Sequence, residues 1–223
     1  MEVITIQKAR ALAMLELDSL SSGGRVRISD CIPALVSKYD FQKFPTTSED
    51  FDLEGKGVHF ESGKADGFLI DSLVIYNGAI FLDTIASTDD SKRILLGLLE
   101  WAREEFGLSY QPSLIRKWGY ISHVVFRCDF PLLRRCSPPL ENLAKKTSRF
   151  MEELFDGLEY DPYQVWIGHD PEKRKNAIAS LFITHRVNTS PSENIFFSEA
   201  PLPTNLHIQF LQEFEDDVRN ESR

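Results

Sequence analysis

The chain has 223 residues, 42% of them hydrophobic and 26% charged, and its formal net charge is −9 at pH 7. These are ordinary globular values, and no apolar run approaches the roughly 18 residues that a membrane span requires. The net negative charge argues against binding nucleic acid with the whole surface. We therefore expect a soluble cytoplasmic protein. Three cysteines lack the spacing of a disulfide framework or a zinc site, and we expect them to be reduced: Cys31, Cys128 and Cys136.

The N-terminal residues predict a helix followed by short elements. Thr5 can cap this first helix, in which apolar residues keep a helical period. These residues are Ile6, Ala9, Ala13, Leu17 and Leu20. After the helix we expect a strand, a short helix with Pro33 in its first turn, a surface loop and another strand. Their respective positions are residues 26–29, 30–39, 43–57 and 58–61.

The strongest local signal lies between Gly67 and Gly107, where the pattern is strand, tight turn, strand and capped helix. Asn77-Gly78 separates two apolar runs and supplies the positive φ values of a two-residue type I′ turn. Both faces of this hairpin are largely apolar, so we expect helices or a partner chain to cover both. The helix should begin in the polar run 87–90 and end at Gly107. Gly97 inside it indicates close approach of another backbone.

The register of the hairpin decides whether its two aspartates can act together. A two-residue turn places Asp71 opposite Thr84 rather than opposite Asp83, so the two carboxylates are expected on different faces of the sheet. They then cannot share a proton or a metal ion. A nuclease-like set that adds Glu61 and Lys64 to these aspartates is also a poor match, because the acid and the lysine lie three residues apart across a glycine.

The second half of the chain predicts strands and two helices. A strand is expected over residues 120–129, and a helix is expected to start at Ser137-Pro138 and to close at Gly157. Further strands are expected over residues 163–168, 179–187 and 194–198, and a last helix from Thr204.

One part of this second half resembles the hairpin unit. Aligning Phe81 with Phe197 superposes Thr88 on Thr204, the expected cap residues of two helices. A distant duplication would explain the match, and so would the shared physics of two strand-strand-helix units. The differing loop lengths favour the second explanation.

The charge is distributed unevenly along the chain. Residues 116–149 hold eight basic residues against the two acids Asp129 and Glu141, so this segment carries about +6. The basic residues are Arg116, Lys117, Arg127, Arg134, Arg135, Lys145, Lys146 and Arg149. On one side of the fold they would form a patch for an acidic protein surface or for nucleic acid. The sequence favours a simpler interpretation. In it Lys145, Lys146 and Arg149 form the solvated face of an amphipathic helix, and the other basic residues pair with surplus acids.

No motif points to a catalytic residue, a metal or a cofactor. Gly63-Lys64 lacks the spacing and the hydroxyl of a phosphate loop, and the five histidines are scattered. We therefore expect a non-catalytic protein-interaction or assembly subunit of a larger complex, with a protein partner or self-association. The alternative is a nucleic-acid-binding protein or metal-dependent nuclease that uses residues 116–149.

The predicted fold class is α+β. We expect an at least partly antiparallel sheet that bears helices, built around the hairpin and the helix after it. The chain should form a single domain over residues 1–223, or two packed lobes at residues 1–112 and 113–223.

Overall fold

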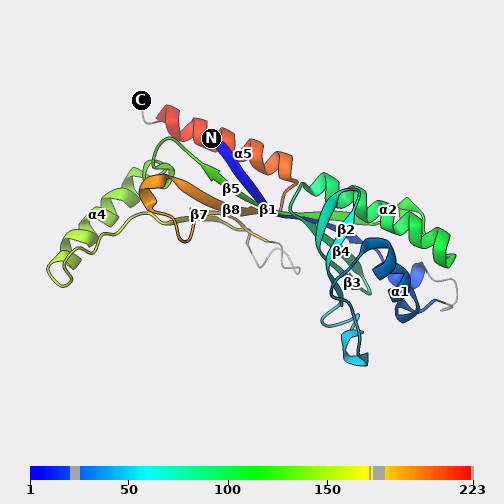
Figure 1. Cartoon of the computed structure of the whole chain (residues 1–223). Coiled ribbons are helices and arrows are strands. Elements are labelled where there is room, and N and C mark those ends of the chain that lie inside the picture. Colours follow the sequence, from blue (N-terminus) through cyan, green and yellow to red (C-terminus); the bar gives the residue numbers. More distant parts are fainter. Residues whose placement is uncertain (21–25, 171, 173–178, 222–223) are drawn as a thin grey trace. The chain divides into compact units, whose positions relative to one another are not determined.

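The computed structural model describes residues 1–20, 26–170, 172 and 179–221. Over these residues the chain is an α+β protein, as predicted, in which an eight-stranded antiparallel sheet carries five α-helices (Figure 1). The strands are β1 (Glu2–Met14), β2 (Val58–Ala65), β3 (Phe68–Tyr76), β4 (Ala79–Thr84), β5 (Lys117–Arg127), β6 (Gln164–Ile167), β7 (Leu181–His185) and β8 (Ile195–Ala200). The helices are α1 (Ile28–Tyr39), α2 (Thr88–Phe106), α3 (Leu132–Arg135), α4 (Pro138–Glu152) and α5 (Thr204–Glu221). None of the helices in the described part combines the length and the apolar character of a membrane span.

The chain divides into two compact units. The N-terminal unit comprises Ile6–Ser122 and Leu202–Thr204. The C-terminal unit comprises Met1–Thr5, His123–Pro201 and Asn205–Arg223. Strands β1 and β5 contribute residues to both units, and the strand order in the sheet is β2-β3-β4-β1-β5-β8-β7-β6.

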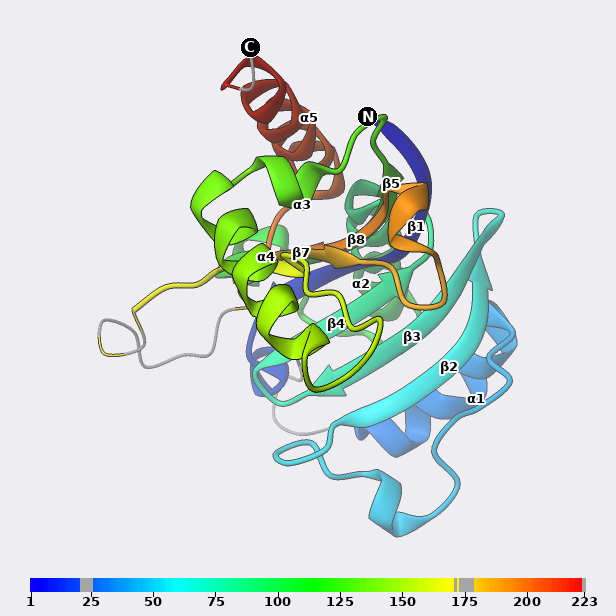
Figure 2. The same ribbon diagram turned by 90° about the vertical axis from the view of Figure 1, so that its left-hand side faces the viewer.

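In the N-terminal unit, α1 and α2 pack on the same face of the strands (Figure 2). Side chains alternate along a strand, so every second residue points toward these helices. On β3 and β4 the buried core residues are Ile70, Leu73, Ile75, Ile80 and Leu82. The opposite face of the hairpin lines a polar cavity instead of packing on these helices, and its cover by a partner chain stays a prediction.

The segment predicted as the first helix is instead strand β1, followed by the short helix η1 (Leu17–Ser19). Ala9, Ala11 and Ala13 also fit an alternating pattern, and all three are fully buried. Their small side chains let α2 come close, and Ser91 Oγ donates a hydrogen bond to the Ala9 carbonyl at 2.6 Å. Alanine favours a helix in isolation, but packing overrides local propensity here.

The hairpin has the predicted two-residue connection, but the predicted turn type is wrong. Neither Asn77 nor Gly78 has a positive φ, which a type I′ turn requires. Hydrogen bonds from the residues after β1 hold the turn instead. The Asn77 carbonyl accepts from the Leu17 amide at 2.8 Å, and the Gly78 carbonyl accepts from the Leu15 amide at 3.2 Å.

The strand pairing departs from the prediction at Asp71. Ser72 pairs with Asp83 as expected, but Thr84 pairs with Ile70 and not with Asp71. Asp71 is therefore the extra residue of a β-bulge, which bends the strand and re-aims the side chain.

Helix α2 has both of the predicted ends. Ser87 Oγ accepts from the Asp90 amide at 3.0 Å, and Gly107 ends the helix in the left-handed region with φ 65°. The expected close approach at Gly97 is wrong, because this residue is exposed and a Cβ atom there would meet nothing within 4 Å.

The remaining predicted elements are present with shifted ends, except one. Residues 26–29 do not form a strand, because α1 begins at Ile28, and Pro33 lies inside α1 rather than in its first turn. Helix α4 starts after Ser137 as predicted but ends at Glu152. The strands predicted in the second half correspond to β5, β6, β7 and β8, and the last helix is α5.

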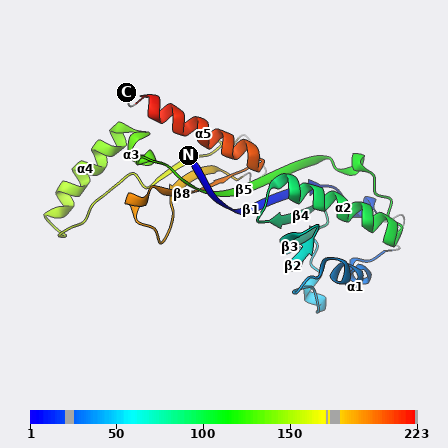
Figure 3. The same cartoon turned by 45° about the horizontal axis from the view of Figure 1, so that its top comes forward.

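In the C-terminal unit, α5 packs on the strands, and Figure 3 shows α4 standing apart from α5. Phe126, Phe196 and Leu211 belong to the core of this unit. The core also contains a polar pair, in which His207 Nε2 lies 2.9 Å from Ser198 Oγ and His207 is fully buried. Burial lowers the pKa of His207 to about 4.

The two units repeat one order of elements: a long strand, a helical part, three strands and a final helix, where the helical part is α1 in the first unit and α3 with α4 in the second. Strands β4 and β8 correspond residue by residue at an offset of 116, because Ala79 is matched to Ile195. The pairing corresponds too, since Ser72 faces Asp83 in one hairpin and Phe182 faces Glu199 in the other.

The same offset relates Thr88 to Thr204, the first residues of α2 and α5. Their hydrogen bonds are reciprocal: the Thr88 amide donates to Thr204 Oγ1 at 3.0 Å, and the Thr204 amide donates to Thr88 Oγ1 at 2.9 Å. The matching order of elements, the matching strand pairing and the reciprocal threonine bonds support a duplication, although the sequence alone favoured shared physics.

We predict that His207 makes stability fall as the pH decreases from 6.5 to 4. An unfolded histidine binds its proton near pH 6.5, whereas folded His207 binds one only near pH 4. Protonation in this window therefore favours the unfolded state, by on the order of 3 kcal/mol at its lower end. His207→Gln should flatten this part of the curve of unfolding free energy against pH, measured by urea titration. His59→Gln, at an exposed site, is the control, and an equal slope in His207→Gln and wild type would refute the prediction.

Candidate functional site

A polar cavity of about 450 Å³ lies on the face of the N-terminal unit's sheet opposite α1 and α2. Glu61, Asp71 and Asp83 all line it. The prediction that Asp71 and Asp83 lie on different faces is therefore wrong, because the β-bulge at Asp71 re-aims that side chain. Three cations line the same cavity: Lys8, Arg10 and Lys43.

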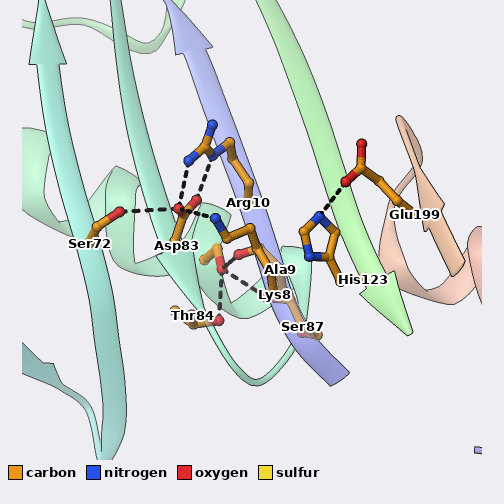
Figure 4. Close-up of polar contacts among 10 residues, drawn as sticks. Lys8, Ala9, Arg10, Ser72, Asp83, Thr84, Ser87, His123 and Glu199 are labelled. Carbon is orange, nitrogen blue, oxygen red and sulfur yellow. Dashed lines mark hydrogen bonds and ion pairs between the residues drawn. The ribbon is translucent and has the colours of Figure 1, made fainter. Parts of the chain in front are cut away.

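Asp83 is the centre of the polar network in this cavity (Figure 4). Arg10 donates to both carboxylate oxygens of Asp83, from Nε at 2.6 Å and from Nη2 at 2.7 Å. Ser72 Oγ donates at 3.1 Å, and Lys8 Nζ lies 3.5 Å away. Burial by itself would raise the pKa of Asp83, which is 1% exposed, but Arg10, Lys8 and Ser72 hold this pKa below its usual value. The carboxylate is therefore ionised, and both of its oxygens already accept hydrogen bonds from side chains of the protein.

The other acids of the cavity have different surroundings. Glu61 forms an exposed ion pair with Lys43, at 2.6 Å between Oε2 and Nζ. Lys64 does not line the cavity and instead lies 3.2 Å from Asp40. The nuclease-like set is therefore not assembled. Across the described residues, no three His, Cys, Asp or Glu side chains are placed to hold a metal ion.

The cavity is electrically balanced, with three cations facing three acids. Its buried carboxylate carries two hydrogen bonds from one guanidinium, an arrangement that fixes two strands together. The chemistry supported by this geometry is that of a structural ion-pair network.

The C-terminal unit carries a row of aromatic rings on the sheet face that points away from α5. His123, Phe197, Phe182 and Trp166 come from neighbouring strands, and successive ring centroids are 5.3, 5.8 and 6.5 Å apart. His123 Nε2 also lies 2.8 Å from Glu199 Oε2 (Figure 4). Trp166, at the edge of the sheet, is 69% exposed.

A group of large, exposed apolar side chains lies on α4 and just after it. We call Leu140, Leu143, Phe150 and Leu154 the α4 stripe; each is between 49% and 62% exposed. Spacings of three and seven residues put Leu140, Leu143 and Phe150 on one side of α4, and Leu154 lies in the turn that follows the helix. An adjacent side of α4 contacts the segment that follows the helix, because the Tyr160 amide donates a hydrogen bond to Ser148 Oγ at 2.8 Å. No residue of α4 is fully buried.

The eight basic residues predicted as a patch divide between the two units, with Arg116 and Lys117 in the N-terminal unit. Four of the eight form ion pairs with acids: Arg116 with Glu16, Arg127 with Glu2, Arg134 with Asp161, and Lys145 with Glu141. The guanidinium of Arg135 lies over the Phe130 ring at 5.0 Å. Lys146 and Arg149, beside the α4 stripe, form no ion pair with any residue in the described part of the chain.

Sequence reasoning missed Lys8 and Arg10, because it placed them on a helix. Their alternation with Ala9 and Ala11 was the available signal for a strand with one charged and one buried face. The aromatic row carried no such signal, since it depends on the pairing of four strands.

Fold and surfaces together define an α+β protein of two similar units, one with a balanced polar cavity and the other with an exposed apolar helix. No protein-family model and no curated protein matches the chain significantly.

We predict that Asp83→Leu is strongly destabilising and that a second substitution recovers much of the loss. Without the carboxylate, the half-buried Arg10 and the neighbouring Lys8 lose their counter-ion, at a cost of about 3 kcal/mol or more. In Asp83→Leu/Arg10→Met both charges of the close pair are absent, and the loss should shrink to roughly 1 kcal/mol. Urea unfolding of the wild type, both single variants and the double variant gives the coupling energy. Purely additive losses would show that the pair is not coupled.

Proposed function

We propose that this protein is a non-catalytic interaction subunit that binds a partner protein through the α4 stripe. The observation that carries the proposal is that α4, a strongly amphipathic helix of 15 residues, leaves its large apolar side chains in water. Contiguous exposed apolar side chains of this kind commonly mark an interaction site. Burial contributes about 1.5–3 kcal/mol for each such side chain. Four of them can therefore support an interface even after the cost of association.

The charges beside the stripe favour an acidic partner. Lys146 lies one helical turn from both Leu143 and Phe150, and Arg149 lies one turn further along, rotated away from the stripe. An acidic amphipathic helix lying along α4 would cover the stripe and pair with Lys146, and the charge of Arg149 would add to the attraction. Two copies of α4 packed on each other would instead bring like charges together, which disfavours self-association through the stripe.

The sheet edge of the same unit supports an interaction role. Strand β6 is the last in the strand order, and its residues Trp166 and Ile167 are both largely exposed. An edge strand with exposed apolar side chains can pair with another chain unless it is covered. The unit thus presents two apolar regions, of which α4 is the larger.

Binding of single-stranded nucleic acid is the second candidate function, and the aromatic row favours it. Rings on a sheet face can stack on bases. Glu199, beside His123 in that row, would repel phosphates, and half of the predicted basic patch is already paired with acids. We therefore expect no electrophoretic shift of single-stranded DNA or RNA at low salt. A shift that weakens as salt is raised would favour this candidate over ours.

We predict that the protein binds a synthetic acidic amphipathic helix. The probe is a fluorescein-labelled peptide about three heptads long, with leucines at helical spacing and glutamates on the opposite face. Fluorescence anisotropy should give a dissociation constant on the order of 10 μM, and Leu143→Ser/Phe150→Ser should weaken binding at least about tenfold because two apolar contacts are lost. Raising the salt should weaken it further, since Lys146 and Arg149 contribute.

Two controls make this test specific. Lys145→Ala changes an α4 residue that already pairs with Glu141, so it should leave the affinity within about twofold. A peptide with lysines in place of the glutamates should bind far more weakly. Equal binding of both peptides, or equal binding by the wild type and Leu143→Ser/Phe150→Ser, would overturn the proposal.

A further inference from the structure

The N-terminal unit contains a second cavity, of about 570 Å³, between α1, α2 and the strands. It lies on the side of the strands that carries α1 and α2 rather than on the polar face of the sheet, and it opens to solvent. Its wall includes buried residues from α1, α2, β3 and β4, among them Leu35, Leu98, Ile75 and Ile80. Of the described residues that line it, all but three are apolar, and the three exceptions are Asp18, Arg27 and Asn77. This size and this lining are those of a site for a small molecule.

The volume is difficult to explain as an ordinary packing defect. Protein interiors pack as densely as organic crystals, and their voids are rarely larger than a water molecule. The cavity opens to solvent, so without an occupant its apolar wall lacks packing partners and stays in contact with water, which costs free energy. Water does not offset such a cost, because an apolar wall offers few hydrogen-bond partners. An apolar occupant would restore the missing contacts.

The polar part of the lining indicates the charge of the occupant. Arg27 is the residue that precedes α1, and its side chain makes no capping bond and no ion pair with any described residue. The N-terminus of a twelve-residue helix adds a partial positive charge at the same place. Asp18, on η1, is the only acid among the lining residues that the structure describes, and it lies exposed. Arg27 and the helix terminus together favour an anionic group over a cationic one.

We propose that this cavity binds an apolar molecule with a single carboxylate, such as a medium-chain fatty acid, with its chain against α2 and its carboxylate at Arg27. The site is independent of the α4 stripe, since every residue that lines it belongs to the N-terminal unit. Cys31 lies in the wall of the cavity, where its Sγ donates a weak hydrogen bond to the Arg27 carbonyl at 3.6 Å. The reactivity of this thiol should therefore change when a ligand occupies the cavity.

The test uses the full chain, with decanoate and 1-decanol as probes. N-ethylmaleimide alkylates the cysteines, and mass spectrometry follows each one separately. Burial raises the pKa of the Cys31 thiol to about 11, so its alkylation is slow enough to time. Decanoate should slow the alkylation of Cys31 at least fivefold and leave Cys136, which lies in the C-terminal unit, unaffected. Decanol should protect Cys31 less at the same concentration.

Two variants locate the ligand within the cavity. Arg27→Gln should weaken decanoate at least fivefold and leave decanol unchanged, because only the charged group is affected. Ala102→Phe should weaken both probes at least tenfold, since a ring at this lining position occupies the space of the chain. If Ala102→Phe fails to fold, the rate of Cys31 alkylation in the wild type, with and without decanoate, still tests whether the cavity binds the ligand. Alkylation of Cys31 at the same rate with and without decanoate would overturn the proposal, and so would equal protection by decanoate and decanol.

Discussion

Asp83 and Arg10 form a bidentate ion pair between β4 and β1, in a position where the carboxylate is almost inaccessible to water. A buried carboxylate without its partner is strongly destabilising, so this pair holds β1 against β4 in one register. In that register Ala9 and Ala11 point toward α2, and Lys8 and Arg10, which alternate with them, line the polar cavity. The buried face and the polar face of the N-terminal unit both depend on this pair.

The C-terminal unit repeats the same plan with other residues. Glu199 on β8 corresponds to Asp83 on β4, and His123 on β5 supplies the base that Arg10 supplies on β1. The reciprocal bonds between Thr88 and Thr204 join the starts of the two equivalent helices. The units differ where α1 of the first is replaced by α3 and α4 of the second, and the exposed apolar stripe lies on that substituted part. The strands and final helix common to both units thus form the fold, and the helices that differ between the units include the proposed interaction site.

The sequence predicts those features whose signal is local. Asn77-Gly78, the cap at Ser87 and the stop at Gly107 mark their elements directly, and the hairpin and α2 are where they were expected. Strand β1 could not be recognised from residue propensity. Its alanines favour a helix in isolation, but in the fold their small side chains allow α2 to pack closely on the strand. The polar cavity depends on the pairing of residues 73 positions apart and on a bulge that no residue type announces. Rules of local spacing therefore placed Asp71 on the wrong face.

The central claim is that the α4 stripe contributes nothing to the folded core and is available to a partner. Urea unfolding of Leu143→Ser/Phe150→Ser measures this most directly. Because both side chains are about 60% exposed, the account predicts an unfolding free energy within about 0.5 kcal/mol of the wild type. A loss of more than about 2 kcal/mol is typical of truncated core residues. Such a loss would show that the stripe belongs to the fold, and the interaction role would then lose its main support.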